Sequence, residues 1–157
     1  ATIIPPRWGV PGGIAMKDII RDITEITRCG AQYRTDSLAD LGLKGCHASY
    51  LEEICAEPGI SQDTLAKRIC INKSNVARQI VVLEEEGFVI RHSAPNDKRA
   101  MELYPTEKTL TLMPEITEIL NKWEDFLLAD LSEEEVEHVH FILQRMRDKA
   151  SGWMGAR

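Results

Sequence analysis

The stretch Leu83-Glu-Glu-Glu-Gly-Phe-Val-Ile-Arg-His-Ser-Ala-Pro-Asn-Asp-Lys-Arg-Ala-Met-Glu-Leu-Tyr104 decides the fold. Gly87 predicts the end of a helix, because glycine readily adopts the left-handed conformation that closes a helix C-terminus. Residues 88–91 and 100–104 predict two short strands, and Pro95-Asn96 between them favours a turn, since proline fixes φ and asparagine tolerates unusual φ. A helix joined to such a hairpin is the outline of a winged helix.

The tip of the predicted hairpin carries two cations, Lys98 and Arg99, in a polar loop. An arginine at such a tip suits the narrow minor groove of DNA, where the negative potential is enhanced. Asp97 beside them would oppose phosphate, so we expect it instead to brace Arg99 or Arg91 through a salt bridge. An ordinary exposed turn is the alternative, because Asn and Asp are frequent in turns.

Two helix starts lie upstream of the hairpin. Ser61 and Asn72 can each accept an otherwise unpaired backbone N–H in the first turn of a helix, and only Cys70-Ile71 separates the two predicted helices. The predicted buried stripe of the second helix is Val76, Ile80 and Leu83. Such a tight join is typical of a helix-turn-helix, whose second helix enters the major groove with its N-terminal residues leading.

The outer side of this second helix supplies most of the predicted DNA contacts. Arginine can pair with guanine through two hydrogen bonds and Asn or Gln with adenine, while Ser and Lys more often hold phosphate. A solvated helix face is the alternative. Together with the preceding helix and the wing, the predicted DNA-binding residues are Ser61, Thr64, Lys67, Lys73, Ser74, Asn75, Arg78, Gln79, Arg91, Asp97, Lys98 and Arg99.

Apolar spacing predicts four more helices around this unit. Pro58-Gly59 ends one of them, and Pro114 inside another predicts a kink or a late start. A capping box, Ser132-Glu-Glu-Glu135, opens the last helix. The other three predicted ranges are 14 to about 36, about 48–55, and 105 to about 129.

The fold class is therefore mainly α with a small β-wing, a winged helix-turn-helix with long N- and C-terminal helices. We expect a single domain over 1–157, with a winged-helix lobe at 40–104 and dimerisation helices at 14–38 and 105–151. The long amphipathic helices have little local core. Their apolar stripes are expected to be buried against a second copy of the chain related by a two-fold axis.

Charge along the chain separates a basic segment from acidic surroundings. The net charge of the 157 residues is −6, yet residues 64–83 carry four Lys or Arg and no Asp or Glu. Residues 105–157 carry 6 Lys or Arg against 11 Asp or Glu. Phosphate contact requires a local basic face, whatever the total charge. The distribution therefore favours double-stranded DNA as a partner over a winged-helix module that binds only protein.

Other classes of protein lack support in the sequence. No nucleophile elbow, P-loop, dinucleotide fingerprint or metalloprotease motif is present, so we do not expect an enzyme. His138 and His140 lie about 200° apart on a helix and cannot share one ion, so no metal or cofactor is expected. The four cysteines form no CxxC pair, and no apolar run approaches the roughly 20 residues of a membrane span. We therefore expect a cytoplasmic protein.

Asn72-Lys-Ser-Asn-Val-Ala-Arg-Gln-Ile-Val-Val-Leu-Glu-Glu-Glu-Gly87, followed by Arg91, Asp97-Lys-Arg99 and Leu103-Tyr-Pro-Thr-Glu-Lys108, resembles the MarR family of bacterial transcription regulators. The family pattern has an Asp-Lys-Ser-x-Val-Thr-Arg recognition helix, a Leu-Glu-x-x-Gly exit, an Asp-x-Arg wing and a Leu-Thr-x-x-Gly restart. By element order the resemblance covers roughly residues 14 to 150.

The chain departs from this pattern at three places. Asn72 replaces the usual Asp, Ala77 the usual Thr or Ser, and the segment 104–109 lacks the usual Gly. The resemblance implies a homodimer on a pseudo-palindromic operator, with recognition helices about 34 Å apart. It also implies repression, relieved by a small aromatic or anionic ligand bound where the dimer helices meet the DNA-binding lobe.

Two kinds of sensing site are conceivable. His47 and Tyr50, with Trp8 or Tyr33, could line a ligand pocket, although they could equally be ordinary core or surface residues. Cys29 and Cys46 are placed near predicted helix ends, where a thiolate can be stabilised. They are the candidates for a redox-responsive regulator, while a simply buried thiol is the alternative.

Overall fold

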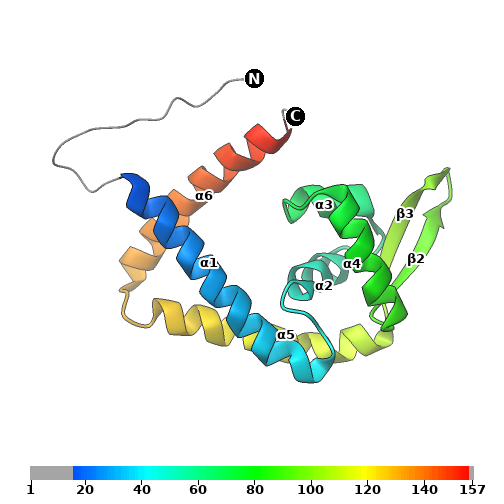
Figure 1. Cartoon of the computed structure of the whole chain (residues 1–157), viewed down its shortest axis with the longest axis horizontal. Helices are drawn as coiled ribbons and strands as arrows, with labels where there is room; N and C mark the ends of the chain where they lie inside the picture. The colour runs from blue at the N-terminus through cyan, green and yellow to red at the C-terminus, as the bar shows by residue number, and fades with distance from the viewer. Residues whose placement is uncertain (1–15, 156–157) are drawn as a thin grey trace.

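Three long helices and a small lobe make up residues 16–155, the part of the chain that the computed structural model describes (Figure 1). The long helices, called the arm helices below, are α1 (Met16–Leu38), α5 (Glu107–Leu128) and α6 (Glu133–Gly155). A 3-10 turn, Ala39–Leu41, follows α1. The lobe contains α2 (His47–Ala56), α3 (Gln62–Arg68), α4 (Lys73–Glu85) and a small sheet. The mainly helical winged helix-turn-helix predicted from the sequence is confirmed.

The sheet has three antiparallel strands in the order β1-β3-β2. β2 (Val89–Ala94) and β3 (Asp97–Pro105) form the wing, which projects from the lobe at the right of Figure 1. β1 (Ile60–Ser61) pairs with the inner half of β3 and was not predicted. Two residues are too short to show strand periodicity, and the pairing depends on residues more than forty positions away. Both wing strands are also longer than predicted, because their outer halves are polar.

Local signals set the helix ends as expected. Ser61 Oγ and Asn72 Oδ1 each accept a backbone N–H three residues further on, at 3.0 and 2.8 Å. Gly87 has φ +77° and closes α4. The capping box is complete, since the Ser132 N–H donates to the Glu135 carboxylate at 2.8 Å and Ser132 Oγ accepts the Glu135 N–H at 3.2 Å. Each of these signals lies within four residues, which is why the sequence showed them.

Of the two effects expected of Pro114, the late start is wrong, while a kink there stays a prediction. α5 begins at Glu107, capped by Thr106, and runs through Pro114 to Leu128. A proline removes one backbone donor from a helix. Burial of Ile116 and of Thr109 against the lobe stabilises the helix on both sides of that position.

The hydrophobic core lies almost entirely in the lobe. α1 contributes Leu38 and α5 contributes Ile116, whereas α6 buries no residue within the described part of the chain. No helix there is long and apolar enough to cross a membrane. The remaining core residues come from the lobe and its junctions: Leu43, Ala48, Tyr50, Leu51, Ile54, Ile60, Leu65, Ala66, Val76, Ile80, Leu83, Phe88, Val89 and Leu103.

Large apolar side chains are exposed along the arm helices. Phe126 of α5 is 73% exposed, and Phe141 and Ile142 of α6 are 59% and 53% exposed. The others on these helices are Ile19, Ile20, Ile26, Leu110, Leu127, Val139, Leu143, Trp153 and Met154. The arm helices are therefore amphipathic, and apolar side chains outside the part of α5 that packs on the lobe stay exposed within the described chain.

Candidate nucleic-acid interface

The turn between α3 and α4 joins the two helices of the helix-turn-helix. The Ile71 N–H donates to the Ala66 carbonyl at 3.1 Å, and the Cys70 N–H to the Lys67 carbonyl at 3.3 Å. Cys70 has φ +55°, a conformation that residues other than glycine adopt at some energetic cost. This short turn fixes the angle at which the start of α4 projects from the lobe.

One side of α4 is buried and the other is open, as predicted. Val76, Ile80 and Leu83 are fully buried. Ser74 and Arg78 are exposed and Asn75 is half-buried. Arg78 makes no ion pair or hydrogen bond with any described residue. Its guanidinium is therefore available for a base edge or a phosphate.

Two cations of the basic segment already have acidic partners in the lobe. Arg68 binds the carboxylates of Glu53, at 3.3 Å, and Glu57. Lys73 Nζ lies 2.6 Å from the Asp63 carboxylate, with both side chains well exposed. Exposed pairs of this kind are worth about 0–1 kcal/mol, so Lys73 can exchange its partner for a phosphate at little cost. Counting charge along the sequence could not distinguish these paired cations from the unpaired ones.

The start of α3 also holds its predicted residues in place. Ser61 Oγ donates to Thr64 Oγ1 at 2.8 Å while it caps the helix, and both residues are half-buried. Lys67 in the last turn is exposed and forms no ion pair with a described residue. Ser61 and Thr64 therefore position α3, and Lys67 is the open cation of that helix.

The wing tip contains a break in strand register. Ser93 pairs with Met101, but Ala94 pairs with Asp97, so the segment Lys98–Ala100 has no partner on β2. A bulge of this kind redirects side chains away from the plane of the sheet. Lys98 and Arg99 lie in the bulge, exposed and without an ion pair in residues 18–155.

The predicted salt bridge from Asp97 to Arg99 or Arg91 is wrong. Asp97 Oδ1 accepts the backbone N–H of Arg99 at 2.9 Å, so it braces the backbone of the bulge and leaves the guanidinium free. Arg91 instead binds Glu84 of α4, with N–O distances of 2.6 and 2.8 Å, and its side chain is 29% exposed. Arg91 thus ties the wing to α4, and its predicted place among the DNA contacts gains no support from this geometry.

The acidic end of α4 is compensated in a way the sequence did not show. Lys108 of α5 donates to the Glu86 carbonyl at 2.8 Å, and its Nζ lies 4.0 Å from the Phe88 ring centroid. A cation at a helix C-terminus stabilises the helix dipole. Together with the Arg91–Glu84 pair, this contact explains why three glutamates are tolerated there.

Three of the predicted ligand-binding residues, His47, Tyr50 and Tyr33, pack against other parts of the chain. His47 is 2% exposed and Tyr50 is fully buried. Burial lowers the pKa of His47 and raises that of Tyr50. Tyr33 of α1 stacks on Trp123 at 5.2 Å and donates to the Ile119 carbonyl at 3.0 Å. Trp8 lies outside the described residues, and a ligand site at these four positions stays a prediction.

The thiols lie in different settings. Cys46 is the N-cap residue of α2 and is exposed, as predicted for a thiol near a helix start. Cys29 lies in the middle of α1, so its predicted place near a helix end is wrong. The helix ends at Leu38, close to the predicted end near residue 36, so the error lay in placing Cys29 near that end. Among the described residues, no three His, Cys, Asp or Glu side chains come together as metal ligands.

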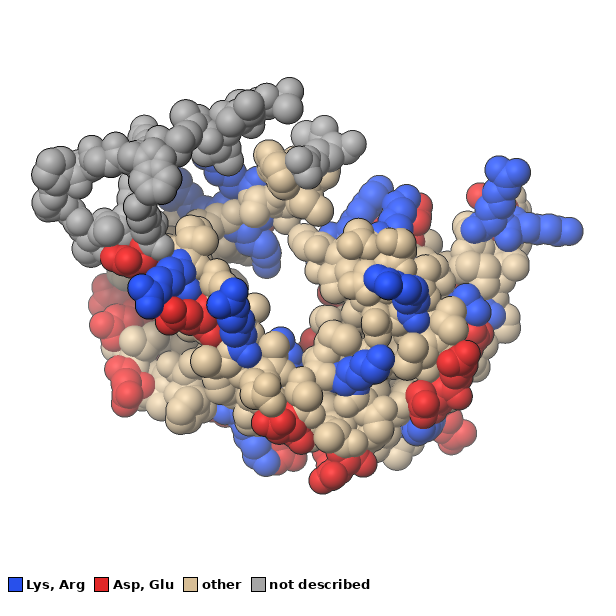
Figure 2. Space-filling model, viewed as in Figure 1, with Lys and Arg blue, Asp and Glu red and all other residues tan. Residues whose placement is uncertain are grey.

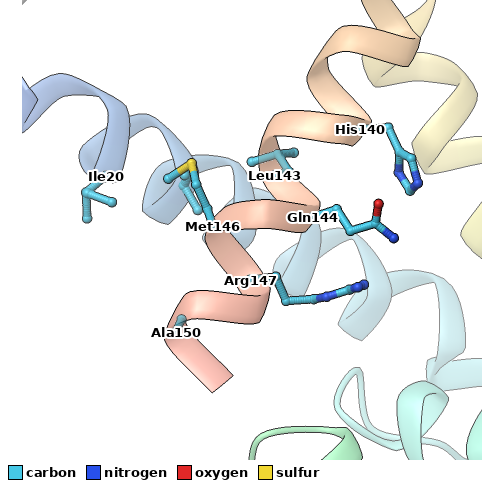
Figure 3. Close-up of a pocket in the computed structure, with 8 residues that line it drawn as sticks. Ile20, His140, Leu143, Gln144, Met146, Arg147 and Ala150 are labelled. Atoms are coloured by element: carbon cyan, nitrogen blue, oxygen red, sulfur yellow. The ribbon is translucent and has the colours of Figure 1, made fainter. Parts of the chain in front are cut away.

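Hollows adjoin the arm helices within the described part of the chain, and the two larger ones lie against a second element. One, of about 440 Å³, lies between α1 and α6, with Leu143 and Met146 facing α1 and His140, Gln144 and Arg147 on another side of α6 (Figure 3). The other, of about 760 Å³, lies between the α3–α4 turn and the end of α6, where Cys70 Sγ is 3.8 Å from Ser151 Oγ. Neither hollow is lined by His47, Tyr50 or Tyr33.

Figure 2 shows Lys and Arg over the lobe and at the tip of the wing, whereas the arm at the left of the view carries charges of both signs. Asp and Glu also gather along the lower edge of the view. A tri-helical unit with a short turn, an open helix face and a cationic wing defines a winged helix-turn-helix protein of the nucleic-acid-binding class.

Comparison with known proteins narrows this class to one family. Residues 47–101 match the model of the MarR family. The chain is 31% identical over 132 residues to the uncharacterized HTH-type transcriptional regulator YybA of Bacillus subtilis (strain 168), covering 84% of this chain and 88% of YybA. The chain belongs to the MarR family of transcriptional regulators.

Solved structures show the same architecture over most of the chain. The transcriptional regulator SlyA superposes with a TM-score of 0.85 at 31% identity, over 89% of this chain and 99% of SlyA. A Listeria monocytogenes protein assigned to the family, crystallised with a 26-mer DNA, superposes with a TM-score of 0.83 at 29% identity, over 87% of this chain and 91% of that one.

Proposed function

We propose that this regulator binds a specific pseudo-palindromic operator as a homodimer, with α4 in the major groove and the wing tip in the minor groove. The observation that carries the proposal is that the helix-turn-helix and the wing hold four cations without acidic partners among the described residues: Lys67, Arg78, Lys98 and Arg99. They lie on α3, on the open side of α4 and in the wing bulge, the elements that approach DNA in proteins of this fold.

The homodimer is supported by the arm helices. Their exposed apolar side chains, among them Phe126, Phe141 and Ile142, would cost solvation free energy if left in water. A second copy offers the same surface, and a two-fold contact between identical patches closes the assembly. Such a dimer would present two recognition helices to successive major grooves about 34 Å apart.

The decisive experiment is selection of bound sequences from random duplex DNA by the full chain. A palindrome with half-sites one helical turn apart is expected, and failure to enrich any sequence would contradict the proposal. Arg78→Ala should weaken binding to the selected operator more than to random DNA. Arg99→Ala should weaken both, and Lys73→Ala should also flatten the salt dependence of binding. Lys122→Ala is the control, because Lys122 pairs with Glu118 on α5 at 2.8 Å.

We also propose that the protein represses transcription and that a small aromatic anion relieves repression. The α1–α6 hollow supports this, since its lining combines apolar Ile20, Leu143 and Met146 with Arg147, whose only acidic contact among the described residues is an exposed ion pair with Asp148 at 3.3 Å. Benzoate serves as the probe, and it should release operator DNA from the wild type and fail to do so in Arg147→Ala. Arg145→Ala is the matched control, because Arg145 lies over the Phe141 ring at 5.7 Å, outside this hollow. Benzoate-insensitive binding by the wild type would end this part of the proposal.

A further inference from the structure

A buried histidine reaches the recognition helix from the start of α2. His47 Nε2 lies 3.0 Å from Gln79 Oε1, and His47 Nδ1 lies 3.2 Å from the backbone nitrogen of Lys44. His47 is 2% exposed, so neither contact competes with bulk water. The side-chain amide of Gln79 is therefore held by the lobe before any DNA arrives.

The Lys44 contact decides which atom of the amide faces His47. A backbone N–H can only donate, so Nδ1 must be the acceptor and carries no proton. A neutral imidazole has one donor and one acceptor, so the proton sits on Nε2. His47 Nε2–H then donates, and the only acceptor on a glutamine side chain is its oxygen. The oxygen of Gln79 is thereby held toward the lobe and its NH₂ group is left as the free end.

The free end of this amide is open to a ligand. Gln79 is half-buried and directly follows the exposed Arg78 on α4. Its Nε2 has no hydrogen-bond partner among the described residues, yet it is not a buried unsatisfied atom, unlike Gln62 Oε1. The two N–H donors of this amide are therefore without a partner among the described residues, one position along α4 from the side chain that carries the proposed base contact.

We propose that the hydrogen bond from His47 leaves Gln79 able only to donate hydrogen bonds to DNA, so that this glutamine selects guanine in the operator and discriminates against adenine. A free glutamine pairs with adenine by donating to N7 and accepting from the N6 amino group. With its oxygen engaged by His47, Gln79 lacks the acceptor for N6. Guanine presents two acceptors, N7 and O6, and thymine presents one, O4. The inference rests on the proposed DNA binding and makes His47 a positioning residue for specificity.

The test compares base preferences of the selected operator among four proteins. Wild type should show a guanine in each half-site whose replacement by adenine weakens binding about tenfold, the discrimination expected of one good base contact. Gln79→Ala should lose that preference, with the four bases within about threefold. His47→Phe should retain binding but accept adenine as well as guanine, because the amide is free to turn. Tyr50→Phe, a buried neighbour on the same helix, should keep the wild-type preference.

A second measurement tests the proton position without DNA and without a variant. Two-bond ¹H–¹⁵N correlation spectra of histidine-labelled wild type at pH 7 should show His47 as the neutral form protonated at Nε2. A proton on Nδ1 would overturn the inference. So would a selected operator in which Gln79→Ala relaxes no position, or relaxes an adenine. Failure to select any operator would instead overturn the proposed function, and the inference with it.

Discussion

The lobe buries its apolar side chains, whereas the arm helices leave many of theirs exposed. In the lobe, Leu51, Leu65 and Ile80 are fully buried, in a core closed by Leu38 and Ile116 from the arms. On the arms, Phe126 and Phe141 are mostly exposed, and α6 buries nothing within the described chain. The two regions have the same kinds of residue, so composition does not account for the difference.

The difference shows which region one chain can complete. Burying apolar surface contributes about 25 cal/mol per Å², and the lobe obtains this from its own elements. Many apolar side chains of the arm helices, Phe126 and Phe141 among them, are not buried in this way within the described chain. We infer that the lobe folds on intramolecular contacts, whereas packing of the arms depends on assembly and thus on protein concentration.

Truncation of a core leucine should have the largest effect. Leu51→Ala should lower the free energy of unfolding by about 3 kcal/mol, because a fully buried leucine leaves a cavity in a closed core. Chemical denaturation monitored by circular dichroism measures this loss. Val81→Ala on α4, 36% exposed and outside the arm helices, is the control and should cost less than about 0.5 kcal/mol. A comparable loss in both variants would show that the loss at Leu51 does not come from a cavity in the core.

Charge placed on the arm should break the dimer without unfolding the lobe. Ile142→Glu on α6 would bury an unpaired carboxylate between two copies, which should weaken dimerisation by about 2 kcal/mol or more. Light scattering during size-exclusion chromatography should detect the monomer at micromolar concentration. Ile90→Glu in the wing makes the same chemical change at a similar exposure, 43% against 53%, and should leave the dimer intact. A wild type that is monomeric, or an Ile142→Glu protein that stays dimeric, would contradict the proposed homodimer through the arm helices.

Loss of the Asp97 hydrogen bond in the wing should have a smaller effect than the two preceding changes, about 1 kcal/mol of binding free energy. Asp97→Ala removes the acceptor of the Arg99 N–H, so the bulge loses its fixed shape and operator affinity should fall about fivefold. This loss should occur although the change removes a negative charge near phosphate. Asp97→Asn keeps an acceptor oxygen and should bind at least as well as wild type. Fluorescence anisotropy with operator DNA measures both, and tighter binding by Asp97→Ala would show that charge outweighs geometry.

The smallest expected effect is a pH dependence that originates in the lobe. Burial lowers the pKa of His47 below its usual value of 6.5, so the folded chain keeps this ring neutral where the unfolded chain protonates it. The free energy of unfolding is therefore highest above pH 6.5 and decreases as the pH falls from 6.5 toward the lowered pKa of His47. Unfolding midpoints measured between pH 7.5 and 5.5 should fall in wild type and in Tyr50→Phe, and fall less in His47→Phe. An equal fall in all three would remove His47 as the cause.

The sequence predicted features that depend on near neighbours. The caps at Ser61 and Asn72, the glycine end of α4 and the box at Ser132 each involve residues within four positions. β1 was missed because its partner strand, β3, comes only after α3 and α4 in the sequence. Pairing across such a separation leaves no periodic trace in a two-residue segment.

The candidate interface was predicted in outline and changed in detail. Lys98 and Arg99 are open cations at the wing tip, as expected, but Arg91 is tied to Glu84 and Asp97 to a backbone N–H. Gln79 was assigned an adenine-type contact from its residue type alone. Its partner His47 lies 32 positions away, and only the fold of the lobe brings the two together.

The sequence by itself determined the helix-turn-helix, the wing and the amphipathic arms, and its motifs indicated the family. The three structural features follow from backbone preferences and apolar periodicity, which act over a few residues. The tertiary structure decided which polar groups remain free. Hydrogen bonds and ion pairs form between atoms within about 3 Å, and the fold chooses those neighbours from any distance along the chain. Because recognition uses the groups left unpaired, the part of the chain that would read DNA was located by its sequence and specified only by its fold.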